Sequence, residues 1–148
     1  MNDAGVNATA VATAKEDQSI FALLAAAHAF EGKVEEALER AGVSGAKYAV
    51  LSALVEAGKP LSLSELAALL SCVRSNMTQL VDRLEADGLV RRVDCPTDRR
   101  SVKAEITQEG RQRHAVAVEE VAQLHRRFAD RVSPTDRGAI ERLLNALT

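Results

Sequence analysis

Arginine side chains gather in the middle of this chain, close to a loop between two short alternating runs. Residues 71–103 contain seven basic and five acidic side chains, a net charge of +2, while the rest of the chain carries −4. Arg99 and Arg100 adjoin Asp98 in the loop DCPTDRR. Guanidinium groups on such a loop release counterions when they meet phosphates. Their clustering therefore indicates the binding of a polyanion, whereas an isolated charge run would indicate only a solvated face.

A run of short hydrogen-bonding side chains precedes this loop. In SNMTQLVDRLEADG, apolar residues recur at helical spacing from Met77 to Leu84, which leaves the opposite face of a helix polar. The outer face of this helix carries Ser75, Asn76, Thr78, Gln79, Asp82 and Arg83. Amide side chains pair with adenine, and arginine pairs with guanine, at base edges in the major groove. This face is suited to reading double-stranded DNA.

The neighbouring sequence predicts the elements that position this face. LSLSELAALL has the form of a short helix that Ser62 and Glu65 start with a capping box. A short turn and a second helix with an exposed polar face are typical of a helix-turn-helix. After Gly88, the runs LVRRV and SVKAEIT predict two strands joined by the arginine loop. The fold class is therefore mainly α with a small β-hairpin wing.

Longer helices are expected on both sides of this unit. Apolar residues at helical spacing predict a helix from Asp17 to about Ala41 and a central helix from about Ala46 to Ala57. Thr107 is expected to cap a helix of more than twenty residues, and Ser133 to cap a last one. Residues 1–16 are small, polar and aperiodic, so we expect a flexible tail there.

Composition and spacing exclude several classes of protein. No stretch approaches the roughly 18 consecutive apolar residues of a membrane span, and the N-terminus lacks the order of a secretory signal, so we expect a cytoplasmic protein without a membrane partner. No nucleophile with its base, paired-carboxylate cleft or phosphate-binding glycine loop suggests an enzyme. His114 and His125 lie about 16 Å apart along one helix, too far to share a metal ion. No cofactor is expected.

The segment from Pro60 to Gly110 resembles the winged helix-turn-helix core of the multiple-antibiotic-resistance regulator (MarR) family. The block LVDRLEADGLVRR, the DRR of the wing and the closing ITQEG carry the resemblance. It implies a homodimeric, ligand-responsive repressor that binds a pseudo-palindromic DNA operator. It also implies a DNA-binding domain at 45–107 and a helical dimerisation region at 17–44 and 108–148.

The resemblance assigns roles to single residues of the wing and of the helix start. Arg74, Ser75, Asn76, Thr78 and Gln79 fall on the exposed start of the family's recognition helix and, with Arg83 further along, are expected to contact DNA. Arg100 falls on the family's wing arginine, Asp98 on the acidic residue that braces it, and Arg99 is a further expected contact. Relatives commonly place Ser just before the recognition helix, whereas this chain has Val73, which cannot cap. We expect Ser71 or Ser75 to cap the helix instead.

The resemblance also implies an effector pocket between the dimerisation helices and the winged domain, so we expect His28 and Tyr48 at a ligand site. Two other functions are weighed against this one. A thiol-based redox response would use Cys72 or Cys95, although Cys72 is expected to be a buried small side chain. A winged-helix module that serves only protein contacts would be expected to lack both the outward amide and hydroxyl side chains and the arginines of the wing.

Overall fold

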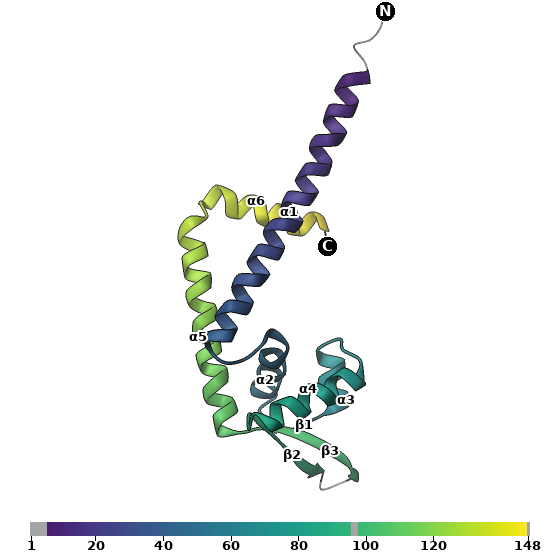
Figure 1. Ribbon diagram of the computed structural model, residues 1–148, viewed down its shortest axis with the longest axis vertical. Coiled ribbons are helices and arrows are strands. Elements are labelled where there is room, and N and C mark those ends of the chain that lie inside the picture. The colour runs from purple at the N-terminus through teal and green to yellow at the C-terminus, as the bar shows by residue number, and fades with distance from the viewer. Residues whose placement is uncertain (1–5, 96–97, 148) are drawn as a thin grey trace, which may run out of the picture. The chain divides into compact units, whose positions relative to one another are not determined.

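The computed structural model describes the backbone of residues 6–95 and 98–147, and the side chains of residues 20–94, 102–143, 145 and 146. The elements follow in the order α1 (Val6–Arg40), α2 (Gly45–Ala57), β1 (Leu61–Ser62), α3 (Leu63–Leu69), α4 (Arg74–Ala86), β2 (Val90–Cys95), β3 (Asp98–Ile106), α5 (Gln108–Arg131) and α6 (Pro134–Leu147) (Figure 1). The predicted class, mainly helical with a small hairpin wing, is confirmed. The chain divides into two compact units, Met1–Val34 and Glu35–Thr148.

The first helix begins earlier than the sequence analysis predicted. Helix α1 starts at Val6, so the expectation that residues 1–16 form a tail outside any helix was wrong from Val6 onward. Four of the residues from 6 to 16 are alanine, which has the highest helix propensity. The segment lacks an apolar repeat, which was the signal used to predict helices. Residues 1–5 lie outside the described part of the chain.

Side-chain caps fix the starts of three helices, as predicted. Ser62 and Glu65 form a reciprocal capping box, in which the Ser62 hydroxyl accepts the Glu65 N–H at 3.2 Å and the Glu65 carboxylate accepts the Ser62 N–H at 2.7 Å. These bonds to Ser62, the backbone one first, hold the pKa of Glu65 below its usual value. Thr107 caps α5 by accepting the Gly110 N–H at 3.0 Å, and Ser133 caps α6 through the Asp136 N–H at 3.2 Å.

The sheet contains a strand that the sequence analysis missed. Strands β2 and β3 form the predicted antiparallel hairpin, but they extend to Cys95 and from Asp98, so most of the predicted loop DCPTDRR belongs to the strands. Strand β1 pairs with the other edge of β3, which gives the order β1-β3-β2. Strand β1 comprises only Leu61 and Ser62, too few residues to show an alternating pattern. Since Ser62 also caps α3, this short strand fixes the start of the helix-turn-helix to the base of the wing.

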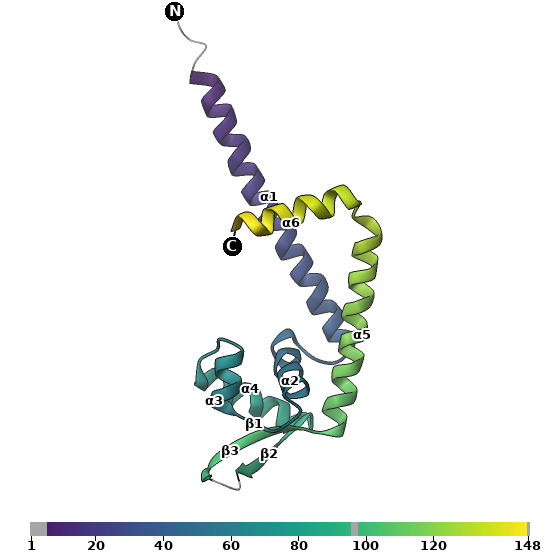
Figure 2. The same ribbon diagram turned by 180° about the vertical axis from the view of Figure 1, so that it is seen from behind.

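Apolar side chains from the end of α1, from α2, α3 and α4, and from the sheet form the core of the second unit. Its largest fully buried members are Leu38, Val50, Leu51, Leu54, Leu66, Met77, Val81, Leu84 and Val90. Figures 1 and 2 show these elements gathered together, with α5 leading from the end of β3 past α2. Among the described residues, no helix combines the length and apolar character that a membrane crossing requires.

The start of α5 packs very closely against the end of α4. Gly88 adopts a left-handed conformation (φ 72°) just after α4, and the Thr107 N–H donates to the carbonyl of Leu89 at 3.1 Å. The Thr107 hydroxyl donates to the carbonyl of Gly88 at 2.7 Å. A Cβ at position 110 would lie 2.1 Å from the Leu89 oxygen. Only glycine at position 110 fits without a shift of the backbone.

Gly110→Ala should therefore destabilise the protein, because the added methyl group must displace α5 or the Leu89 carbonyl. We expect the free energy of unfolding to fall by about 1–3 kcal/mol, measured by denaturant titration. Gly32→Ala is the matched control, since no atom lies within 4 Å of its added Cβ. The control should leave stability unchanged or raise it by up to about 1 kcal/mol. Equal stability of Gly110→Ala and the parent chain would contradict the close approach.

Candidate nucleic-acid interface

Helices α3 and α4 form a helix-turn-helix with one buried and one exposed side. Residues 70–73 connect them, and α4 buries Met77, Val81 and Leu84. The opposite side of α4 faces solvent. All six predicted DNA-contacting residues of this helix are exposed: Arg74, Ser75, Asn76, Thr78, Gln79 and Arg83. The buried stripe thus orients the polar face outward, as the sequence predicted.

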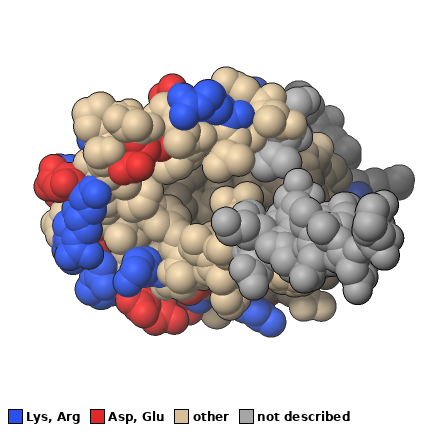
Figure 3. Space-filling model, turned by 90° about the horizontal axis from the view of Figure 1, so that it is seen from above, with Lys and Arg blue, Asp and Glu red and all other residues tan. Residues whose placement is uncertain are grey.

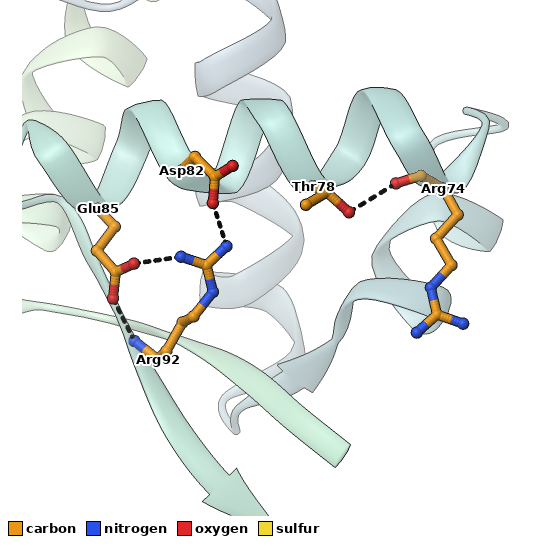
Figure 4. A network of polar contacts seen from close by, with 5 residues as sticks. All are labelled: Arg74, Thr78, Asp82, Glu85 and Arg92. Atoms are coloured by element: carbon orange, nitrogen blue, oxygen red, sulfur yellow. Dashed lines mark hydrogen bonds and ion pairs between the residues drawn. The ribbon is translucent and has the colours of Figure 1, made fainter. Parts of the chain in front are cut away.

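The first half of this exposed face is open to a ligand. Thr78 donates its hydroxyl hydrogen to the carbonyl of Arg74 at 3.0 Å, and the Arg74 side chain projects away from the helix (Figure 4). In the described part of the chain, the guanidinium groups of Arg74 and Arg83 form no hydrogen bond or ion pair with protein groups. Both are available to pair with phosphates or with guanine.

The start of α4 differs from the prediction. Val73 occupies the N-cap position (φ −72°, ψ 143°) and its side chain makes no capping hydrogen bond. Ser71 adopts φ 49° in the preceding turn, and Ser75 lies inside the first helical turn. The turn geometry therefore places a valine rather than either serine at the capping position. The expectation that Ser71 or Ser75 caps α4 was wrong.

Two of the clustered arginines are paired with carboxylates. Arg91 Nε donates to Glu105 Oε2 at 2.5 Å across the hairpin, where Arg91 and Glu105 are register partners. The Arg92 guanidinium bonds to Asp82 and Glu85 of α4 (Figure 4). The sequence analysis counted both arginines as part of one basic patch. Alternation along β2, which points consecutive side chains to opposite faces, was the signal that could have separated them.

The predicted residues of the wing tip fall largely outside the described side chains. Asp98, Arg99 and Arg100 begin β3, but the predicted bracing of Arg100 by Asp98 lies beyond the side chains that the structure describes, as does Cys95. Cys72 is half-buried, with its Sγ 3.5 Å from the carbonyl of Val73. The burial expected for Cys72 is thus only partial.

A groove of about 570 Å³ lies beside α2 and the end of α3. Its lining residues are Tyr48, Ala49, Ser52, Ala53, Glu56, Ala57, Leu69 and Leu70. Helix α5 supports one wall, because His114 stacks on Tyr48 with ring centroids 5.4 Å apart and its Nε2 lies 3.0 Å from the Ser52 hydroxyl. Burial lowers the pKa of His114, and the charge of Glu56 acts in the opposite direction.

The two predicted ligand residues belong to different units of the chain. Tyr48 lines the groove, whereas His28 belongs to the unit Met1–Val34, is exposed, and has its Nδ1 3.7 Å from a carboxylate oxygen of Glu31. The described side chains include no group of three or more His, Cys, Asp or Glu that could hold a metal ion.

A helix-turn-helix whose second helix presents an exposed polar face, followed directly by a β-hairpin, defines the winged helix-turn-helix class. The sequence profile of the MarR family matches residues 41–101. The chain is 37% identical over 81 residues to the HTH-type transcriptional regulator PrsX of Escherichia coli, which covers 54% of this chain and 49% of PrsX. It thus spans about half the length of that relative.

Two solved structures extend the similarity beyond the winged domain. Sco3205, a MarR family transcriptional regulator from Streptomyces coelicolor solved in complex with DNA, is 29% identical, with a TM-score of 0.73 over 90% of this chain and 86% of its own. CouR from Rhodococcus jostii RHA1, bound to p-coumaroyl-CoA, is 29% identical, with a TM-score of 0.68 over 89% of this chain and 92% of its own. Residues 41–101 of this chain are therefore similar to the MarR family, and the fold of most of the chain is similar to that of Sco3205 and CouR.

Proposed function

We propose that this protein is a DNA-binding transcriptional regulator that acts as a homodimeric, ligand-responsive repressor on a pseudo-palindromic operator. The observation that carries the proposal is the exposed first half of α4, where polar side chains lie beside the guanidinium of Arg74, which has no partner among the described residues. Sco3205, a MarR family regulator 29% identical to this chain, has been solved in complex with DNA, which supports DNA as the ligand proposed for this chain.

In this proposal, α4 enters the major groove and the wing follows the adjacent backbone. Asn76 and Gln79 carry amides that can pair bidentately with adenine, while Arg74 and Arg83 are free to meet phosphates or guanine. Ser75 and Thr78 add shorter contacts from the same face. At the wing tip, Arg99 and Arg100 would reach the minor groove, where the negative potential is concentrated, and Asp98 would brace Arg100.

The dimer is proposed from apolar side chains left exposed on the flanking helices. Every residue from Ile20 to Lys33 is exposed, although a helix in water gains most of its stability from packing. The exposed large apolar side chains include Ile20, Phe21, Leu23 and Leu24 of α1, Val116 and Val118 of α5, and Ile140 and Leu143 of α6. Among the described residues in Figure 3, most side chains are uncharged, and the charged ones lie toward the margins. A second copy would cover such surfaces and present a second α4 to the other half-site.

Light scattering at micromolar concentration should give the mass of a dimer. Ile20→Glu should shift the mass toward that of a monomer, because it places a charge on the apolar side of α1. Ala29→Glu is the matched control, since nine residues along a helix with 3.6 residues per turn place it about 180° from Ile20. A monomer mass for the unchanged protein would rule out the dimer.

Selection of bound duplexes from a random DNA pool should enrich a pseudo-palindromic sequence. Asn76→Ala and Gln79→Ala should each relax the preference at particular base pairs by about 1–3 kcal/mol, because each removes a bidentate amide. Gln112→Ala, an exposed glutamine of α5, should change nothing. Failure to enrich any sequence would overturn the proposed function. Equal weakening on all duplexes would show that these amides position the helix without reading bases.

We propose that the groove beside α2 binds the effector. Its volume is in the range of small-molecule sites, and its lining combines small apolar residues with the hydroxyl of Ser52 and the carboxylate of Glu56. These groups suit a compact, largely apolar molecule with one hydrogen-bond donor or positive group. CouR, which is 29% identical to this chain, was solved with p-coumaroyl-CoA bound, and this supports an effector for this chain. The groove residues of this chain suit a smaller ligand.

N-phenyl-1-naphthylamine, an uncharged aromatic amine that fluoresces in apolar surroundings, should bind the groove and weaken operator binding. Ala53→Phe should abolish the fluorescence rise by filling the groove, while leaving operator affinity without the dye within about twofold of the parent. Ala46→Phe, on an exposed position of the same helix, is the matched control and should retain the response. An unchanged response in Ala53→Phe would place the effector site elsewhere.

A further inference from the structure

The exposed face of α4 changes character along its length. Arg74, Thr78, Asp82 and Glu85 recur at intervals of four and three residues, which places them on one side of the helix (Figure 4). The first two offer a free guanidinium and a hydroxyl, and the last two are carboxylates. Unpaired carboxylates on a face turned toward DNA would repel phosphates. The second half of this face therefore requires a counter-charge.

Arg92 of β2 supplies that counter-charge. Its Nη2 donates to Asp82 Oδ1 and its Nη1 to Glu85 Oε2. Its backbone N–H donates to the other Glu85 oxygen at 3.1 Å, so Glu85 holds both the main chain and the side chain of Arg92. The Arg92 side chain is 30% exposed, against 67% for Arg91. Arg92 is directed at α4, while Arg91 points to the opposite face of the hairpin.

We propose that Arg92 is a positioning residue for operator binding, which fixes the angle between α4 and the wing without touching DNA. The inference rests on the proposed function, since it concerns how this chain would hold its two DNA-contacting elements. Each carboxylate of α4 engages a separate nitrogen of one rigid guanidinium fork, so the fork sets an orientation as well as a distance.

The surroundings of Arg92 make it a firm connection. Val90, the first residue of β2, and Leu89 just before it are each only 2% exposed, so the strand that carries Arg92 is anchored in the core. Hydrogen bonding to Asp82 raises the pKa of Arg92, in keeping with a guanidinium whose donors are directed at carboxylates. A bound phosphate would have to displace these carboxylates, whereas no described protein group is bonded to the guanidinium of Arg74 or Arg83.

The test compares specific and non-specific DNA binding of full-length variants across a salt series. Arg92→Lys keeps the charge but loses the fork, so it should lower the ratio of operator to non-specific affinity by about fivefold or more. The slope of log affinity against log salt should stay within about half a unit of the parent, since no phosphate contact is lost. Arg91→Lys, the same change at the neighbouring position, should leave both quantities as in the parent.

Asp82→Asn examines the same contact from the helix, at a half-exposed position that should leave the fold intact. It should also lower the specificity ratio, even though it removes a negative charge that faces DNA. Tighter binding by Asp82→Asn, equal behaviour of Arg92→Lys and Arg91→Lys, or a slope reduced by about one unit in Arg92→Gln would each overturn the inference. Absence of any operator preference in the parent chain would overturn the proposed function and the inference together.

Discussion

Thr107 is hydrogen-bonded to Leu89 at the point where α4, the wing and α5 come together. The Thr107 N–H donates to the Leu89 carbonyl, and the Thr107 hydroxyl both donates to Gly88 and accepts from Gly110. The Leu89 N–H in turn donates to the carbonyl of Leu84 in the last turn of α4, at 2.9 Å. Leu89 is thus hydrogen-bonded to α4 through its N–H and to Thr107 through its carbonyl. The angle between α4 and the wing depends on this junction, where α5 lies so close to the Leu89 carbonyl that position 110 has no room for a side chain.

Sequence reasoning predicted the features that are encoded within a few residues of one another. The capping box at Ser62, the cap at Thr107 and the buried stripe of α4 each depend on spacings of three or four positions, and each is present. Strand β1 was missed because its two residues are too few to show a periodic pattern. The start of α1 at Val6 was missed because alanine promotes a helix without producing an amphipathic pattern. The sequence showed that Val73 cannot cap α4. Ser71 or Ser75 was expected to cap in its place only because each lies two residues from Val73 in the chain.

The arginine cluster shows where sequence reasoning about the site ends. A count of charges treats Arg74, Arg91 and Arg92 as equivalent. Of these three, Arg91 and Arg92 have carboxylate partners, and Arg74 has none among the described residues. Arg91 and Arg92 are divided by strand alternation and by partners that lie 14, 10 and 7 positions away in the chain. Such pairings arise from the tertiary arrangement of α4 and the hairpin. The sequence therefore predicts which side chains could meet a polyanion, and the fold decides which of them remain free to do so.

The bond from Thr78 to the carbonyl of Arg74 limits the chemistry available at the centre of the exposed face. A hydroxyl has a single hydrogen, and here that hydrogen is directed into the helix at 3.0 Å. Toward solvent, Thr78 then offers only lone pairs and a methyl group. It can accept from the amino group of cytosine or adenine, or lie against the methyl group of thymine, but it has no hydrogen to give to the acceptors of guanine. Thr78 can therefore act toward a ligand as a hydrogen-bond acceptor and as an apolar contact, but not as a donor.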